Sequence, residues 1–249
     1  MNLFLRFTAL PSAALLGAIL LLSGCSKSAT QADQAAEMAQ AEQASQSAGA
    51  DHQTHPDAST PDSAYVALTG KQILLLTSAL SGEPIRYDYL ANQIFPDYRA
   101  TSDTFKKHDM LTMFEPQLDS MIADAKAHPY IAWIDPNSQL EHYDANQKSF
   151  HDLSALFLQV GGGAVSFPDA VGYTVAVSNG QQFQRLGVMD ETKARAIEAL
   201  VGKWPGLQVK IFAYAQSADL QGAPTLHTVI TKIQILDPHG AVLLEQQAH

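Results

Sequence analysis

The sequence predicts an α+β fold in which N-terminal helices are followed by an antiparallel sheet with one inserted helix. Two observations carry this prediction. Between residues 69 and 128, apolar side chains recur at intervals of three and four, the period of a helix. After Pro129 the period falls to two, and short Gly-, Pro- and Asn-containing turns separate the apolar runs. Because tight turns join antiparallel neighbours, these runs are expected to pair antiparallel in one domain over residues 64–249.

The first helices are marked by their ends. Thr69 and Gln72 fit a capping box, in which Thr69 is the N-cap and Gln72 reaches back to it, and Gly82 suits the C-terminal stop. A second, short helix is expected over residues 87–95, closed by Pro96.

A third helix is expected to begin at Ser102 and to continue to about His128. Pro116 lies within this stretch. Because proline lacks an amide hydrogen, it must either begin a new turn or kink the helix at that point.

The strands are expected at residues 130–134, 139–143, 153–160, 173–178, 182–188, 207–216, 226–236 and 241–246. Asp135-Pro136-Asn137-Ser138 suits a type I turn between the first two strands. Asn179-Gly180 predicts a tight hairpin, since both residues tolerate positive φ. The inserted helix begins after Asp190 and stops at Gly202, and Asp237-Pro238-His239-Gly240 forms the last turn.

The N-terminus reads as an export signal. Residues 1–6 carry one positive charge, and residues 13–22 form an apolar core that is too short to span a bilayer, which takes ~20 apolar residues. The core ends in Leu22-Ser23-Gly24-Cys25, and Cys25 is the only cysteine of the chain. A lone free thiol is unusual in an exported protein, so a dedicated use for this cysteine is expected.

Leu22-Ser23-Gly24-Cys25 resembles the lipobox of bacterial lipoproteins, and the folded body looks like that of an uncharacterised bacterial lipoprotein family. The resemblance implies that residues 1–24 are a signal peptide and that Cys25 carries acyl chains as the first mature residue. Several acyl chains give stable membrane anchoring. In this family Asp after the cysteine favours the inner membrane, so Ser26 favours the outer membrane, with the protein facing the periplasm.

Residues 25–63 are expected to be the lipidated cysteine and a disordered tether rich in Ala, Gln and Ser. As a flexible coil the tether would span about 35 Å root-mean-square. Its segment 51–57, with two histidines and two aspartates, is a conceivable metal patch. Zinc sites need a scaffold that fixes ligand geometry, which a tether does not provide, so no metal site is expected.

Charge and motifs exclude several functions. The formal net charge is −10, and Lys106-Lys107 is the largest basic cluster, so nucleic-acid binding is not expected. The sequence contains no Gly-x-Ser-x-Gly, Ser-x-x-Lys, His-Glu-x-x-His or Walker-type phosphate loop. No cofactor is implied and no catalytic residue is assigned; whether the chain is an enzyme stays open, with the balance towards a non-catalytic protein.

Three sets of residues are considered for a site. Gly161 to Ser166 could present backbone amides to an oxyanion, or form a plain loop between strands. The scattered pairs His108-Asp109 and His151-Asp152 need not form a dyad, because neighbours in sequence point in different directions. On the strand 207–216, Phe212 and Tyr214 form a possible ligand-binding face, although helices of the same domain would more often cover such a face.

Two functional hypotheses remain. The first is a lipid-anchored cell-envelope protein, bound to the membrane through Cys25, that acts as a non-catalytic binding or adapter module for an envelope protein or a cell-wall component. The alternative is a periplasm-facing hydrolase whose site is assembled from residues distant in sequence, drawn from His108, His128, His142, His151, Asp109 and Asp152.

Overall fold

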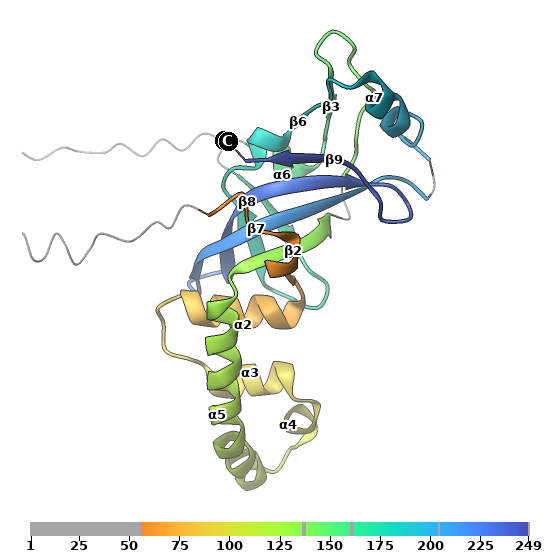
Figure 1. Ribbon diagram of the computed structural model, residues 1–249. Coiled ribbons are helices and arrows are strands. Elements are labelled where there is room, and N and C mark those ends of the chain that lie inside the picture. Colours follow the sequence, from red (N-terminus) through yellow and green to blue (C-terminus); the bar gives the residue numbers. More distant parts are fainter. Residues whose placement is uncertain (1–55, 136–137, 160–161, 204, 249) are drawn as a thin grey trace, which may run out of the picture. The chain divides into compact units, whose positions relative to one another are not determined.

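The computed structural model describes residues 56–135, 138–159, 162–203 and 205–248, all within one compact unit, Gln53–His249 (Figure 1). It confirms the α+β class: helices combine with a seven-stranded sheet that is largely antiparallel. The signal peptide, Cys25 and most of the predicted tether lie outside the described residues.

The chain first forms a 3₁₀ turn η1 (Asp62–Ala64) and a short strand β1 (Val66–Ala67). The helices are α2 (Gly70–Leu80), α3 (Tyr87–Ile94), α4 (Pro96–Ala100), α5 (Thr104–Ala127), α6 (Ala155–Leu158) and α7 (Glu191–Glu198), with a second 3₁₀ turn η2 (Gly180–Phe183). In Figure 1, α2 to α5 gather at one end of the sheet, and β3, β6 and α7 at the other.

The remaining strands are β2 (Tyr130–Asp135), β3 (Ser149–His151), β4 (Gly163–Ser166), β5 (Thr174–Val177), β6 (Arg185–Gly187), β7 (Gln208–Asp219), β8 (Thr225–Leu236) and β9 (Val242–Gln247). The main sheet has the order β1-β2-β7-β8-β5-β4, and β9 also pairs with β8. Among the strand pairs that the structure describes in this sheet, β1–β2 and β5–β8 are parallel and the others antiparallel. A separate two-stranded sheet joins β3 and β6.

Local capping signals are confirmed at two helices. The Thr69 side chain accepts a hydrogen bond from the Gln72 amide at the start of α2, and Gly82 adopts φ 69° after its end. Asp190 accepts from the amides of Thr192 and Lys193 at the start of α7. Each is a short-range interaction between residues at most three positions apart, which is why the sequence reveals it.

Helix α5 differs from its prediction in two details. Its N-cap is Asp103, whose side chain accepts from the Lys106 amide, rather than Ser102. Pro116 lies inside the helix, which continues from Thr104 to Ala127 without a break. Within the described part of the chain, neither α5 nor any other helix combines the length and apolar character needed to cross a membrane.

Three strand predictions are wrong. Residues 139–143 form no strand of the sheet, and β2 instead pairs with β1 and β7. The stretch 153–160 contains helix α6, because Ser154 caps it by accepting from the Leu156 amide. Asn179-Gly180 forms no hairpin: Asn179 has φ −112°, β5 pairs with β4 and β8, and β6 pairs with β3.

The Asn179 side chain makes the two hydrogen bonds to the β8 backbone that a neighbouring strand would otherwise make. Its side-chain amide donates to the Ile230 carbonyl and its side-chain oxygen accepts from the Ile230 amide, both at 2.8 Å. These bonds satisfy the edge of β8 between the end of β5 and the start of its pairing with β9. Gly180 is required by close packing rather than by a positive φ, because a Cβ there would lie 2.2 Å from the Leu156 carbonyl oxygen.

The core lies on the helical face of the sheet. Helix α2 packs against β7 and β8 and buries Ile73, Leu74 and Leu76. Alternate residues of β7 are buried apolar side chains, namely Val209, Ile211, Ala213 and Ala215.

The opposite face of the sheet is covered by residues 56–67, which we call the strap. The sequence places most of this segment in the tether, with the domain starting at residue 64. The structure instead attaches this segment to the sheet through Asp62, Tyr65 and β1, so residues 56–63 belong with the folded body.

Candidate functional site

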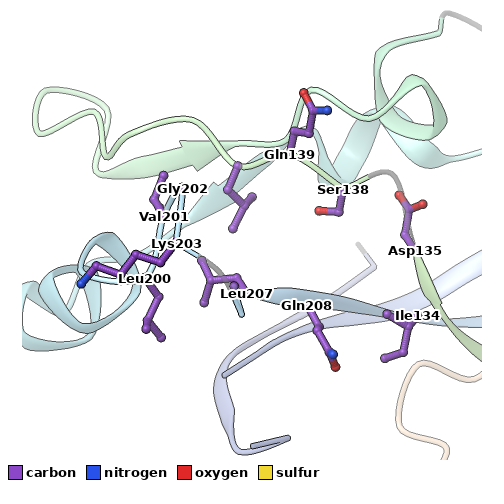
Figure 2. A pocket seen from close by; sticks show the side chains of 12 residues that line it. Ile134, Asp135, Ser138, Gln139, Leu200, Val201, Gly202, Lys203, Leu207 and Gln208 are labelled. Atoms are coloured by element: carbon purple, nitrogen blue, oxygen red, sulfur yellow. The ribbon is translucent and has the colours of Figure 1, made fainter. Parts of the chain in front are cut away.

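A pocket of about 480 Å³ opens where β2 ends (Figure 2). One wall comes from the end of β2 and the loop after it, and the other from the segment between α7 and β7. The lining residues are Ile134, Asp135, Ser138, Gln139, Leu140, Leu200, Val201, Gly202, Lys203, Gly206, Leu207 and Gln208. The volume falls within the range of small-ligand sites, about 300–1,000 Å³, and the lining combines apolar side chains with a few polar groups, as such sites do.

Asp135, the last residue of β2, supplies a buried carboxylate to the pocket wall, with an exposed fraction of 5%. The Ser154 hydroxyl donates to its Oδ2 at 2.8 Å. Since Ser154 is also the N-cap of α6, this bond ties the end of β2 to the start of that helix.

Asp152 lies behind this wall and is fully buried. One oxygen accepts from the Ser138 hydroxyl at 2.6 Å, and the other accepts from the Ser154 amide at 2.8 Å and from the Gln139 amide at 3.4 Å. The Asp152 carboxylate therefore helps to hold the loop that carries Ser138 and Gln139 against the start of α6, together with a backbone hydrogen bond from the Leu153 amide to the Gln139 carbonyl.

The electrostatics of this carboxylate are set by its surroundings. Burial raises the pKa of Asp152 above its ordinary value, the Asp135 carboxylate adds to the rise, and the three hydrogen bonds oppose it. Each hydrogen-bond partner of Asp152 is neutral. The two carboxylate oxygens of Asp152 therefore position a loop, and the pocket that this loop helps to form is suited to binding.

Replacing Asp152 with Asn should keep the fold and change how stability depends on pH. Because its pKa is raised in the folded state, the contribution of Asp152 is fully present below its ordinary pKa and is lost as pH rises through the folded value. Relative to the parent chain, D152N should therefore gain unfolding free energy as the pH rises above about 4, measured by urea denaturation over a series of pH values.

The control is Asp152→Ala, which leaves two backbone amides and one hydroxyl without their acceptor. It should lower the unfolding free energy by about 3 kcal/mol. A difference between D152N and the parent chain that stays constant with pH would contradict the raised pKa.

The histidines considered for catalysis are dispersed. Within the described ranges each of four pairs with a carboxylate of its own: His128 with Asp124, His142 with Glu198, His151 with Glu141 at 3.9 Å, and His227 with Asp219. His108 and Asp109 lie exposed on α5. The structure therefore does not bring the six residues of the hydrolase hypothesis together.

The proposed aromatic ligand face is also different from its prediction. Phe212 is completely buried, so it does not form an open face. Its cover is the strap rather than a helix: the Tyr65 ring meets it edge-on at 4.9 Å between centroids. Tyr214 is half-buried and packs edge-on against Tyr130 at 5.0 Å.

The glycine-rich stretch forms a strand rather than an anion-binding loop. Gly163 to Ser166 are β4, and a Cβ at Gly163 would lie 2.4 Å from the Leu156 Cα, so close packing on α6 explains this glycine. Gly161 lies outside the described residues. In the part of the chain that the structure describes, no three His, Cys, Asp or Glu side chains gather to hold a metal ion.

Comparisons with protein-family models, with curated proteins and with solved structures found no match to this chain. The pocket and its contacts are therefore interpreted from their own chemistry.

Sequence reasoning missed both the pocket and the Asp135–Ser154–Asp152–Ser138 network. One local signal was present in the sequence. Asp152 lies two positions before Ser154, the N-cap of α6, and at this spacing an Asp side chain commonly accepts a hydrogen bond from the backbone amide of the later residue. The pocket itself required the approach of residues 200–203 and 206–208 to the end of β2, which no local pattern encodes.

Proposed function

We propose that this chain is a lipid-anchored cell-envelope protein whose folded body is a non-catalytic binding module. Acyl chains on Cys25 would hold it to the outer membrane, facing the periplasm, and the tether would set its reach. The lipobox supports the location. The pocket at the end of β2 is the observation that carries the binding role.

The pocket favours binding over hydrolysis because of what its polar groups do. Its buried carboxylates hold Ser138, Gln139 and Ser154 in place. The apolar side chains Leu200, Leu207 and Ile134 offer a surface for a partner's side chain or short segment. A hydrolase would need a nucleophile and an activating base in contact, and four of the described histidines are instead engaged with separate carboxylates.

The test is site-specific photo-crosslinking in intact cells. A photo-reactive residue in place of Lys203, which is exposed and lines the pocket, should give an adduct of one discrete mass with an envelope component. The matched control replaces Lys106, which is equally exposed on the first turn of α5.

A second substitution checks that the adduct depends on the pocket. Leu207→Arg places a long charged side chain in the apolar lining and should abolish crosslinking from position 203. Identical adducts from both positions, or an adduct that survives Leu207→Arg, would show that the pocket is not the binding site.

A further inference from the structure

The strap is a thin cover over buried polar and aromatic groups. None of residues 56–67 is itself buried. Beneath them, Phe212 and Thr231 are completely buried and Lys232 has an exposed fraction of only 4%. A segment that hides such groups while burying little of its own surface gains little hydrophobic free energy from its attachment.

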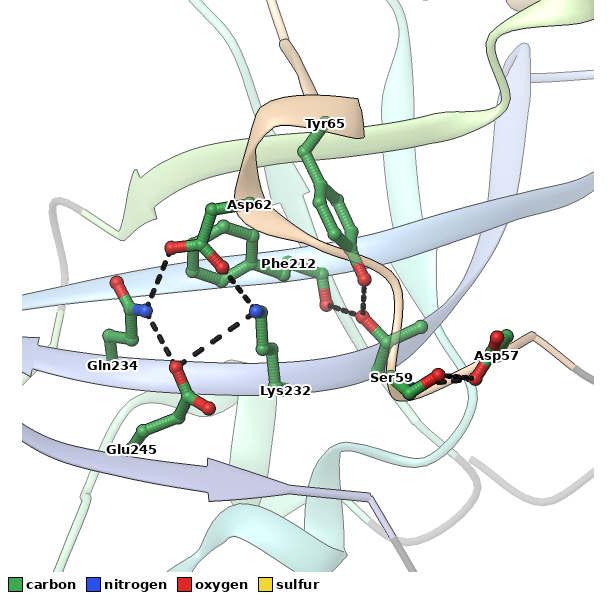
Figure 3. Close-up of polar contacts among 9 residues, drawn as sticks. Asp57, Ser59, Asp62, Tyr65, Phe212, Lys232, Gln234 and Glu245 are labelled. Carbon is green, nitrogen blue, oxygen red and sulfur yellow. Dashed lines mark hydrogen bonds and ion pairs between the residues drawn. The ribbon is translucent and has the colours of Figure 1, made fainter.

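Besides the β1–β2 pairing and a hydrogen bond from the Asp57 amide to the Tyr130 hydroxyl, two side chains three residues apart hold the strap. Asp62 forms an ion pair with the Lys232 ammonium and accepts from the Gln234 side-chain amide at 3.0 Å (Figure 3). Tyr65 forms a hydrogen bond with the Thr231 hydroxyl at 2.7 Å and places its ring against Phe212.

A bulge in β8 shapes the surface of the sheet that contacts the strap, which we call the binding face. Phe212 pairs with Lys232 while Ala213 pairs with Ile230, so Thr231 is an extra residue in β8. Bulges re-aim side chains, and here two consecutive residues, Thr231 and Lys232, both reach the strap. The ammonium of Lys232 also lies 4.8 Å from the Phe212 ring centroid, which adds a cation–π contact.

If the strap leaves the sheet, the buried Lys232 ammonium still has a charged partner. Glu245 lies 3.9 Å from the Lys232 ammonium and accepts from Gln234 at 2.7 Å, so Lys232 keeps a carboxylate partner when Asp62 leaves. An ion pair also stabilises a buried contact less than a well-packed apolar pair would. The attachment is therefore specific in chemistry and modest in strength.

We propose that the strap occupies, in cis, a binding face for a peptide of a partner protein that forms a single 3₁₀ turn, as η1 does, and carries a carboxylate three residues before an aromatic ring. The carboxylate would take the place of Asp62 on Lys232, and the ring the place of Tyr65 on Phe212. Because the strap is covalently attached, its effective concentration is on the order of millimolar, and a partner must exceed that advantage to displace it.

The test uses the full mature chain with Cys25→Ser, so that it stays in solution, and a fluorescent peptide of residues 56–67. In the double variant Asp62→Ala/Tyr65→Ala the strap loses both side-chain contacts, and the labelled peptide should bind, measured by anisotropy. The parent chain should bind it at least about tenfold more weakly, because its own strap competes. A peptide with the same two alanines should not bind.

Hydrogen exchange provides the structural control. In the double variant the amides of residues 56–67 should exchange faster, while those of β7 and β8 stay protected. Asp57→Ala removes a carboxylate whose side-chain contacts are with Ser59 of the strap itself, so it should leave exchange unchanged. Loss of protection in β7 and β8, or no peptide binding up to about 1 mM, would overturn the proposal.

Discussion

Asn179→Ala is expected to lower the unfolding free energy by about 3 kcal/mol. The substitution removes both partners of the Ile230 backbone, its amide and its carbonyl, each bonded at 2.8 Å. Ile230 is completely buried, so its backbone groups rely on the Asn179 side chain for these two bonds. Leaving one buried polar group unsatisfied costs about 1–3 kcal/mol, and here two are affected. Urea denaturation followed by circular dichroism measures the change.

Two further substitutions separate this effect from a general disturbance of the loop. Asn179→Asp keeps the acceptor for the Ile230 amide but loses the donor to the Ile230 carbonyl. This substitution should therefore also lower the unfolding free energy relative to the parent chain. Gln182→Ala, at an exposed position of η2, should change the free energy by less than about 0.5 kcal/mol. Equal stabilities for Asn179→Ala and Gln182→Ala would show that the amide does not support β8.

Cys25→Ala is expected to move nearly all of the protein from the membrane fraction to the soluble fraction. Each buried methylene of an acyl chain contributes about 0.8 kcal/mol to membrane binding, so loss of several chains removes the anchor. The described helices provide no substitute that spans a membrane. Ultracentrifugation of lysed cells, with a high-salt wash to remove peripheral proteins, measures the distribution.

Substitutions at the next residue serve as the matched controls. Ser26→Ala should leave the protein in the outer-membrane fraction, whereas Ser26→Asp should move it towards the inner membrane. A Cys25→Ala chain that sediments with membranes after the salt wash would mean that another part of the protein attaches it.

The features that sequence reasoning predicted correctly depend on neighbouring residues. The Thr69 cap, the Asp190 cap and the Asp237 turn, where the Ala241 carbonyl accepts from the Asp237 amide, each join residues within four positions. At such short range the side chain and the backbone it stabilises are visible together in the sequence.

The hairpin error arose because a distant contact decided the conformation, whereas the helix at 153–160 also has a local cap that the sequence analysis missed. Asn179 reads as a hairpin residue, but its amide bonds to Ile230, 51 positions away. The run 153–160 is apolar enough for a strand or a buried helix, and periodicity alone does not separate the two. The cap at Ser154 and the close contact of α6 with β4 select the helix.

The candidate sites were beyond the reach of the sequence for the same reason. The strap has a composition typical of a linker, and what attaches it is a contact between Asp62 and Lys232, 170 positions apart. In the same way, Asp135 and Asp152 become one network only through Ser154, after β2 and α6 have come together.

Mass spectrometry of the mature N-terminus tests the proposed anchoring most directly. Protein purified from membranes with detergent should begin at Cys25, and its first peptide should carry the mass of a diacylglyceryl group on sulfur. A first peptide that begins after Cys25, or that contains an unmodified cysteine, would contradict the proposal that acyl chains hold this binding module to the membrane.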